Sequence, residues 1–334
     1  MKQFIIYTIL CMVSLFIIAG CSGNENADSR NVSTSNSQEY LMIIKTLSSP
    51  FWVNLKNGIE EEANRLGVNV TVLAGNSEDD IQGQLRLFEE NIAKNYAGIG
   101  FAPISPVNLI SAVSQAYAKG IYLVNVDEKV NMEQLKANKA NVEGFVNTDN
   151  FKVGASAAKF IVEQIKSGDV IIIEGKAGTT SGEDRRTGAT SVFTNTAGIN
   201  LVASQPADWD RTRALDVTSS LLQRYPNIKA IYCCNDTMAL GAQQAVENIQ
   251  KQGSIIVVGT DGTPEAFQSI KEGRLKATME QDSKQIGAQG LRLLVEAVQS
   301  GKGLISIDAE PTVIGLEAIL VTQDNVEERI ENNK

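Results

Sequence analysis

Aromatic and polar side chains recur together at the ends of apolar runs in this chain. The clusters are Phe51-Trp52, Asp127-Glu128, Trp209-Asp210-Arg211, Asn235-Asp236 and Thr260-Asp261. Each apolar run has the composition of a buried parallel strand, and ligands of open α/β sheets collect beyond the carboxyl ends of such strands. Flat rings can cover the C–H faces of a pyranose, while Asp, Asn and Arg can satisfy its hydroxyls. The pattern therefore predicts a cleft of the size of a sugar.

Strand-like and helix-like segments alternate along the chain and form two series. In the first, the apolar run 40–47 is followed by Ser49 and Pro50, which predict the start of an amphipathic helix that ends at Gly67. Further apolar runs follow at 68–74, 98–102 and 121–126. This alternation predicts a parallel sheet with helices on both faces.

The second series begins near 142–148 and repeats the pattern. Its expected strands are 169–174, 200–205, 228–234, 254–260 and 275–280. Helices are expected to begin near Asp149, Glu183, Trp209, Thr237 and Pro264. Two such series predict two α/β lobes that face each other across a crevice.

The first 38 residues are typical of export and lipid anchoring. Lys2, the apolar stretch 4–18 and the box ending in Cys21 predict a lipoprotein signal peptide over residues 1–20, with lipidation of Cys21. The Ser- and Asn-rich residues 21–38 are expected to form a disordered tether. A permanent transmembrane anchor is the alternative, but its apolar core falls short of the about 20 residues that a spanning helix needs. The folded part is thus expected outside the cytoplasmic membrane, at the cell envelope.

The composition excludes several classes of enzyme. Histidine is absent, which rules out Ser-His-Asp and Cys-His catalysis. Neither G-x-G-x-x-G nor a P-loop motif occurs, and the loop with Gly175, Gly178 and Gly182 is interpreted as a flexible turn that leads to Arg185. The net charge of -9 argues against nucleic acid as a partner. We therefore expect no cofactor and no metal, and two buried free thiols at Cys233 and Cys234.

Four stretches carry a resemblance to a known family: residues 45–52 (KTLSSPFW), 122–129 (YLVNVDEK), 203–211 (ASQPADWDR) and 235–239 (NDTMA). Roughly residues 40–323, which contain these four stretches, resemble the periplasmic ribose-type sugar-binding proteins. The resemblance implies an α/β fold of two doubly wound parallel-sheet lobes joined by a three-segment hinge, the type I periplasmic binding protein fold. The implied lobes are 39–147 with 282–313, and 148–281 with 314–325.

The resemblance also implies which residues contact the sugar. From the first lobe these are Ser49, Phe51, Trp52, Asp127 and Glu128, and from the second Arg185, Trp209, Asn235, Asp261 and Gln281. Ribose binders typically have two phenylalanines in place of Phe51-Trp52, and Asp-Arg in place of Asp127-Glu128. Lys45 could replace the missing cation while Glu128 accepts from an additional hydroxyl. This arrangement is similar to that of the allose binders and favours a hexose over a pentose.

The expected function is a monomeric receptor that binds D-allose or a related aldose and delivers it to an ABC permease. One alternative is a receptor for ribose or another aldose that feeds a chemoreceptor or sensor kinase. A glycosidase using Asp127 and Glu128 is a further alternative, but adjacent residues rarely flank a glycosidic bond. Trp52 and Trp209 could also be core residues, and Asp127-Glu128 a solvated pair.

Overall fold

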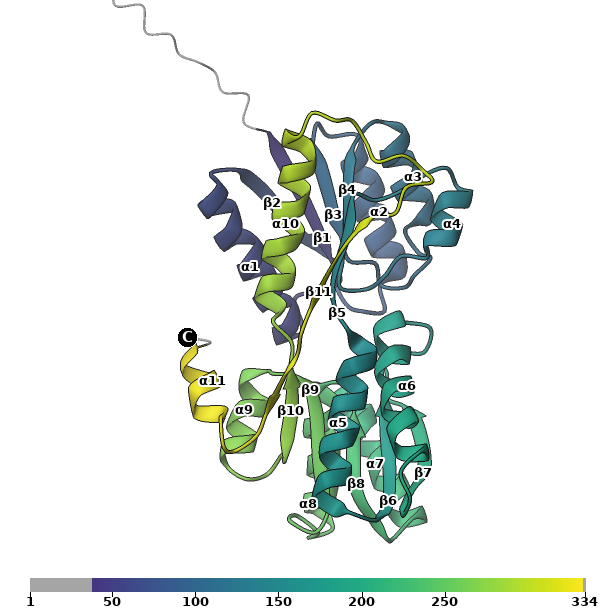
Figure 1. The fold of residues 1–334 in the computed structure, drawn as a ribbon, viewed down its shortest axis with the longest axis vertical. Helices are drawn as coiled ribbons and strands as arrows, with labels where there is room; N and C mark the ends of the chain where they lie inside the picture. Colours follow the sequence, from purple (N-terminus) through teal and green to yellow (C-terminus); the bar gives the residue numbers. More distant parts are fainter. Residues whose placement is uncertain (1–37, 333–334) are drawn as a thin grey trace, which may run out of the picture. The chain divides into compact units, whose positions relative to one another are not determined.

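The computed structural model describes residues 38–332, which form two α/β lobes (Figure 1). The expectations for the signal peptide (1–20), for lipidation of Cys21 and for the segment 21–37 lie outside the described residues. Within residues 38–332, no helix is long and apolar enough to cross a membrane.

The first lobe is built around a six-stranded parallel sheet with the order β11-β5-β4-β3-β1-β2. Its elements are β1 (Glu39–Ile44), α1 (Pro50–Leu66), β2 (Asn69–Ala74), α2 (Ile81–Ile92), β3 (Gly98–Phe101), α3 (Ile110–Ala118), β4 (Tyr122–Val126), α4 (Met132–Ala137), β5 (Gly144–Thr148), α10 (Ser283–Gln299) and β11 (Thr312–Leu316).

Alternating side chains of β1 divide the core of this lobe into two layers. Tyr40, Met42 and Ile44 pack with α1 and α10 on one face of the sheet. Leu41 and Ile43 pack with α2, α3 and α4 on the other face. Because successive residues of a strand point to opposite faces, one continuous apolar run fills both layers. This explains why β1 is apolar at every position from Tyr40 to Ile44.

The second lobe has a six-stranded sheet with the order β12-β10-β9-β8-β6-β7. Its elements are α5 (Asn150–Ile165), β6 (Gly168–Glu174), α6 (Thr180–Thr194), β7 (Ile199–Pro206), α7 (Arg211–Arg224), β8 (Ile228–Cys233), α8 (Asp236–Asn248), β9 (Ile256–Asp261), α9 (Pro264–Lys271), β10 (Ala277–Glu280), β12 (Ile319–Val321) and α11 (Val326–Asn332). The pairing is parallel except that the edge strand β12 runs antiparallel to β10.

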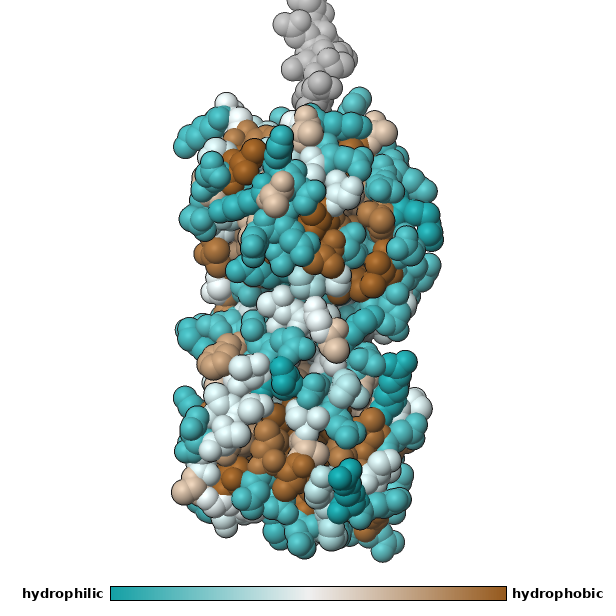
Figure 2. All heavy atoms as spheres, turned by 90° about the vertical axis from the view of Figure 1, so that its right-hand side faces the viewer, coloured by the Kyte–Doolittle hydropathy of each residue, from teal (hydrophilic) through white to brown (hydrophobic). Residues whose placement is uncertain are grey.

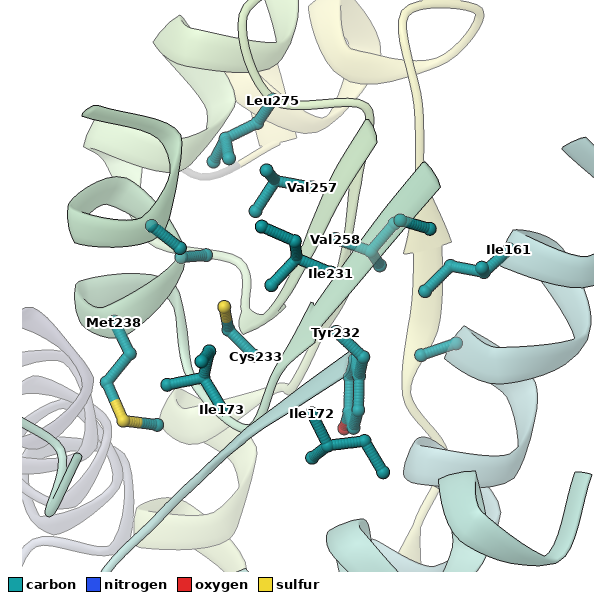
Figure 3. Packing of buried hydrophobic residues seen from close by; sticks show 14 of the residues in the cluster. Ile161, Ile172, Ile173, Ile231, Tyr232, Cys233, Met238, Val257, Val258 and Leu275 are labelled. Carbon is teal, nitrogen blue, oxygen red and sulfur yellow. The ribbon is translucent and has the colours of Figure 1, made fainter. Parts of the chain in front are cut away.

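The core of the second lobe shows the same alternation (Figure 3). Ile172 and Tyr232 lie toward Ile161 of α5, whereas Ile173 and Cys233 lie toward Met238 of α8. Cys233 and Cys234 are both buried free thiols, which confirms the expectation for this pair. Burial raises the pKa of Cys234 to about 12, so this thiol stays protonated.

Within residues 38–332 the chain crosses between the lobes three times: from β5 to α5, from β10 to α10, and from β11 to β12 (Figure 1). The expected doubly wound, two-lobed fold with three crossing segments is confirmed. These crossings bring the carboxyl ends of the strands of both sheets toward each other, which is where ligands of such sheets bind.

The helix starts differ in detail from the expectation. Helix α6 begins at Thr180, ahead of the expected start near Glu183, and α7 begins at Arg211, after the expected start near Trp209. Trp209 therefore lies in the loop before α7.

Hydrophilic residues predominate on the face shown in Figure 2, and hydrophobic residues form separate patches on both lobes.

Candidate functional site

A cavity lies between the two lobes at the carboxyl ends of their strands. It is lined by Lys45, Ser49, Phe51, Trp52, Glu78, Asp127, Ser181, Arg185, Trp209, Asn235, Asp261 and Gln281. Ten of the eleven predicted contact residues are thus brought together. The exception is Glu128, which is fully buried beside the cavity and does not line it.

Lys45 follows β1 directly and lies among three carboxylates of the first lobe. Its Nζ is 3.5 Å from Glu128 Oε2, 3.9 Å from Asp127 Oδ2 and 4.0 Å from Glu78 Oε2. Burial lowers the pKa of Lys45, but the carboxylates led by Glu128 outweigh it, so the net pKa is raised. Lys45 is only 2% exposed and nevertheless stays charged.

The aromatic wall of the first lobe is the first turn of α1. Ser49 occupies the N-cap and Pro50 the first helical position, so Phe51 and Trp52 are presented at the helix start. Their rings meet edge to face, with centroids 5.0 Å apart. Trp52 Nε1 donates to Glu78 Oε1 at 2.8 Å, which fixes the orientation of the indole.

In the second lobe, Arg185 of α6 is held by groups from two neighbouring elements. Its Nε donates to Asn150 Oδ1 at 2.8 Å, and its Nη1 donates to the carbonyl of Cys234 at 2.7 Å. Nη1 also lies 3.5 Å from Asp261 Oδ1, which accepts from Gln281 Nε2 at 2.8 Å. The guanidinium is buried and kept in place without any ligand, so it can serve as a preorganised donor.

Two buried polar atoms at the cavity have no hydrogen-bond partner among residues 38–332: Trp209 Nε1 and Gln281 Oε1. Buried donors and acceptors are normally satisfied, since an unsatisfied one costs about 1–3 kcal/mol. One donor and one acceptor left open at the same cavity are suited to a polar ligand that can both accept and donate, as a hydroxylated ligand does.

Burial raises the pKa of both aspartates, but a different cation opposes it in each case. Burial raises the pKa of Asp127 to about 6, although Lys45 opposes this. Burial also raises the pKa of Asp261 well above its usual range, against the opposing charge of Arg185. Both backbones are unusual for non-glycine residues, with φ of 58° at Asp127 and 128° at Asp261. Such strain concentrates at functional sites.

Sequence reasoning missed two lining residues, Glu78 and Ser181. Both follow carboxyl ends of strands, β2 and β6, so the rule that pointed to Asp127 applies to them as well. No aromatic residue lies near Glu78 in the sequence, so Glu78 does not belong to any of the aromatic and polar clusters that predict the cleft. Ser181 lay in the glycine-containing loop that was interpreted only as a turn.

A larger cavity of about 380 Å³ lies between α1, α10 and α11. Its charged side chains are engaged with one another: Glu62 accepts from Arg65 and Arg292, and Glu280 accepts from Arg329. The cavity between the strand ends shares Gln281 with this one, but it alone of the two is lined by Trp209, whose Nε1 has no partner among residues 38–332, and it is therefore the better candidate for a ligand site.

The fold and the cleft are those of a solute-binding protein, and comparison with known proteins supports this. Residues 40–303 match the model of the periplasmic binding protein domain. The chain belongs to this family, and its role is binding rather than catalysis.

Among its relatives is the D-allose-binding periplasmic protein of Escherichia coli (strain K12). The two are 56% identical over 287 residues, covering 85% of this chain and 92% of the relative. The ribose import binding protein of Bacillus subtilis (strain 168) is 33% identical over 84% of this chain and 88% of its own length. Among solved structures, a periplasmic solute-binding protein of an ABC transporter from Actinobacillus succinogenes, with bound D-allose, gives a TM-score of 0.81. That protein is 30% identical, and the match covers 87% of this chain and 99% of the other. The predicted family resemblance is confirmed.

Proposed function

We propose that this protein binds a single monosaccharide, D-allose, between its lobes. It binds the sugar outside the cytoplasmic membrane and delivers it to an ABC permease. The observation that carries the proposal is the cavity itself. Aromatic rings from both lobes line it, together with a buried arginine, two aspartates, and an indole donor and an amide acceptor that have no partner among residues 38–332. The identity to a D-allose-binding relative supports the choice of sugar.

The chemistry of the lining residues suits a pyranose. Phe51, Trp52 and Trp209 offer flat apolar surfaces for its C–H faces, as aromatic side chains do in sugar sites. Arg185 and Asp261 offer a charged donor and an acceptor for adjacent hydroxyls. In this proposal, Lys45 and Asp127 bind a further hydroxyl from the first lobe.

Capture requires the lobes to move, and the proposal assigns this motion to the three crossing segments. The expected moving bodies are residues 39–147 with 282–313 and residues 148–281 with 314–325, except that β5 and β11 keep residues 148 and 314–316 in the first lobe. A closed form is selected by whichever ligand binds it better than the open form. We propose that the monomeric closed form is presented to the permease. Presentation to a chemoreceptor or sensor kinase, with ribose or another aldose as ligand, is the second candidate, favoured by the ribose-binding relatives.

Intrinsic fluorescence tests the proposal, because Trp52 and Trp209 are the chain's two tryptophans and both line the cavity. We expect D-allose to saturate the signal at the lowest concentration, near micromolar, followed by ribose and then glucose. Arg185→Ala should weaken binding by about 2–4 kcal/mol, since it removes a charge-assisted donor. Tighter binding of glucose would contradict the choice of allose. No response to any monosaccharide would contradict the sugar site.

We also propose that Cys21 carries the lipid that anchors the protein at the cell envelope. A cysteine that carries one diacylated group on its sulfur and an acyl chain on its nitrogen holds the two or more chains that stable membrane attachment needs. Cys21→Ser is expected to leave the protein unprocessed or released, measured by membrane fractionation. A Ser variant that remains bound through salt and carbonate washing would show that the leader is itself the anchor.

A further inference from the structure

Glu128 stands apart from the other predicted contact residues because it bridges the lobes instead of facing the cavity. It follows β4 of the first lobe and is fully buried. Its Oε1 accepts from the backbone N–H of Thr180, and its Oε2 accepts from Ser181 Oγ at 2.7 Å. Thr180 and Ser181 are the first residues of α6 in the second lobe. The contact therefore exists only while the lobes are together.

The start of α6 lacks the local cap that would make this contact dispensable. Thr179 occupies the N-cap, but its side chain makes no capping bond and donates to the carbonyl of Lys176 instead. The first N–H groups of a helix have no partner within the helix, and a carboxylate near them is stabilising. Glu128 supplies that carboxylate from the opposite lobe.

The carboxylate of Glu128 also contacts two residues that do line the cavity, one from each lobe. Lys45 Nζ lies 3.5 Å from Oε2, the same oxygen that accepts from Ser181. The backbone of Glu128 is itself fixed, because its carbonyl accepts from the buried Asn125 Nδ2 at 2.8 Å. The side chain is thus a rigid connection between a cation of the first lobe and a hydroxyl of the second.

We propose that Glu128 is a positioning residue that completes the site on closure and does not contact the sugar. When the lobes meet, it places Ser181 against the ligand, holds Lys45 in position and stabilises the start of α6. This inference rests on the proposed function, because it assumes a ligand in the cavity. It replaces the expectation that Glu128 accepts a sugar hydroxyl.

The inference predicts a kinetic pattern. Because the contacts of Glu128 with Thr180 and Ser181 form only after the lobes close, their loss should speed dissociation and leave association nearly unchanged. In Glu128→Gln, which keeps the side-chain volume, we expect the dissociation rate of D-allose to rise about tenfold, with the association rate within about twofold. Ser181→Ala should raise the dissociation rate less, by about threefold. In the double variant the two factors should not multiply, because both changes remove the same contact.

Asp79→Asn is the matched control. Asp79 pairs with Lys176, so this ion pair also joins the first lobe to the loop before α6. It differs from the Glu128 contact in that the Asp79 side chain is 73% exposed. Exposed ion pairs contribute little, so the dissociation rate should stay within about twofold of wild type.

The experiment is stopped-flow tryptophan fluorescence with D-allose and with ribose, after thermal unfolding has confirmed that each ligand-free variant is folded. A positioning residue should change dissociation of both sugars by the same factor. A loss confined to one sugar would show that Glu128 contacts a hydroxyl directly, and would overturn the inference. Unchanged dissociation in both Glu128→Gln and Ser181→Ala would also overturn it. Wild-type protein that binds neither sugar would instead contradict the proposed function, and the inference with it.

Discussion

The two lobes present their tryptophans to the cavity in different ways. Trp52 lies in the regular first turn of α1, and its indole N–H is already bonded to Glu78. Trp209 lies in a loop where Asp208 and Trp209 both have left-handed backbones, with φ of 53° and 68°. The indole N–H of Trp209 has no partner among residues 38–332.

The difference indicates that the first-lobe wall is complete without ligand, whereas the second-lobe wall has an unsatisfied group that a ligand can pair. A left-handed non-glycine residue costs about 1–3 kcal/mol and persists only where its surroundings hold it. Here the surroundings include Gly175 and Gly182, whose missing side chains leave room for the ring of Trp209. The second wall therefore depends on tertiary contacts, and the first on a local helix start.

Among the changes that distinguish the two walls, the largest effect is expected from filling the space behind Trp209. A Cβ at Gly175 would lie 2.0 Å from Trp209 Cη2, so Gly175→Ala must displace the ring from the cavity wall. We expect sugar affinity, measured by calorimetry, to fall about 100-fold, because the displaced ring no longer packs against the sugar. Gly315→Ala is the control, because a Cβ there meets no atom within 4 Å. Near-native affinity in Gly175→Ala would show that the second wall does not depend on the packing of Trp209 against Gly175.

A smaller effect, the pH dependence of sugar affinity, distinguishes Asp127 of the first lobe from Asp261 of the second. The raised pKa of Asp127, about 6, means that it loses its charge as pH falls through 6, and with it an acceptor for the sugar. Affinity should fall about tenfold between pH 7 and pH 5 in wild type and stay nearly constant in Asp127→Asn. The effect of Asp127 on stability has the opposite sign. A carboxyl whose pKa is raised by folding stabilises the fold fully below its unfolded pKa, and this contribution is lost as pH rises through 6.

Calorimetry at a series of pH values, with thermal unfolding at the same values, checks both trends. If the affinity already falls on lowering the pH from above 7, and Asp127→Asn does not remove the fall, the carboxyl of Asp261 in the second lobe controls binding instead.

The sequence could predict most of the fold and the ligand-facing edge of the sheets for a simple physical reason, whereas contact residues such as Arg185 and Gln281 came from the family resemblance. Buried parallel strands are apolar throughout, and their carboxyl ends are marked by residues such as Asp127 and Asn235, so both the sheets and the ligand-facing edge can be recognised. The start of α1 was predictable because Ser49 and Pro50 are local signals.

What could not be predicted depends on contacts between lobes or between distant segments. The start of α6 lies ahead of its expected place, where Thr180 is bonded by Glu128 of the other lobe. The left-handed backbone at Trp209 has no local glycine to announce it, since the glycines that accommodate its ring are Gly175 and Gly182. The role of Glu78 could not be predicted either, because the indole that it binds is 26 positions away in the chain.

The smallest effect is expected from replacing each tryptophan with phenylalanine, which removes the indole N–H and keeps an aromatic ring. This pair of substitutions is the sharpest test of the difference between the two walls. In Trp52→Phe, Glu78 loses its donor beside Lys45, so the ligand-free protein should lose about 1 kcal/mol of stability. In Trp209→Phe, a donor that has no partner among residues 38–332 is removed, so stability without ligand should stay the same or rise slightly, while sugar binding weakens by about 1 kcal/mol. Urea unfolding of both variants measures the first quantity, and calorimetry the second. If Trp209→Phe destabilises the ligand-free protein as much as Trp52→Phe does, then the indole of Trp209 is already satisfied in solution, and the second wall is as complete without ligand as the first.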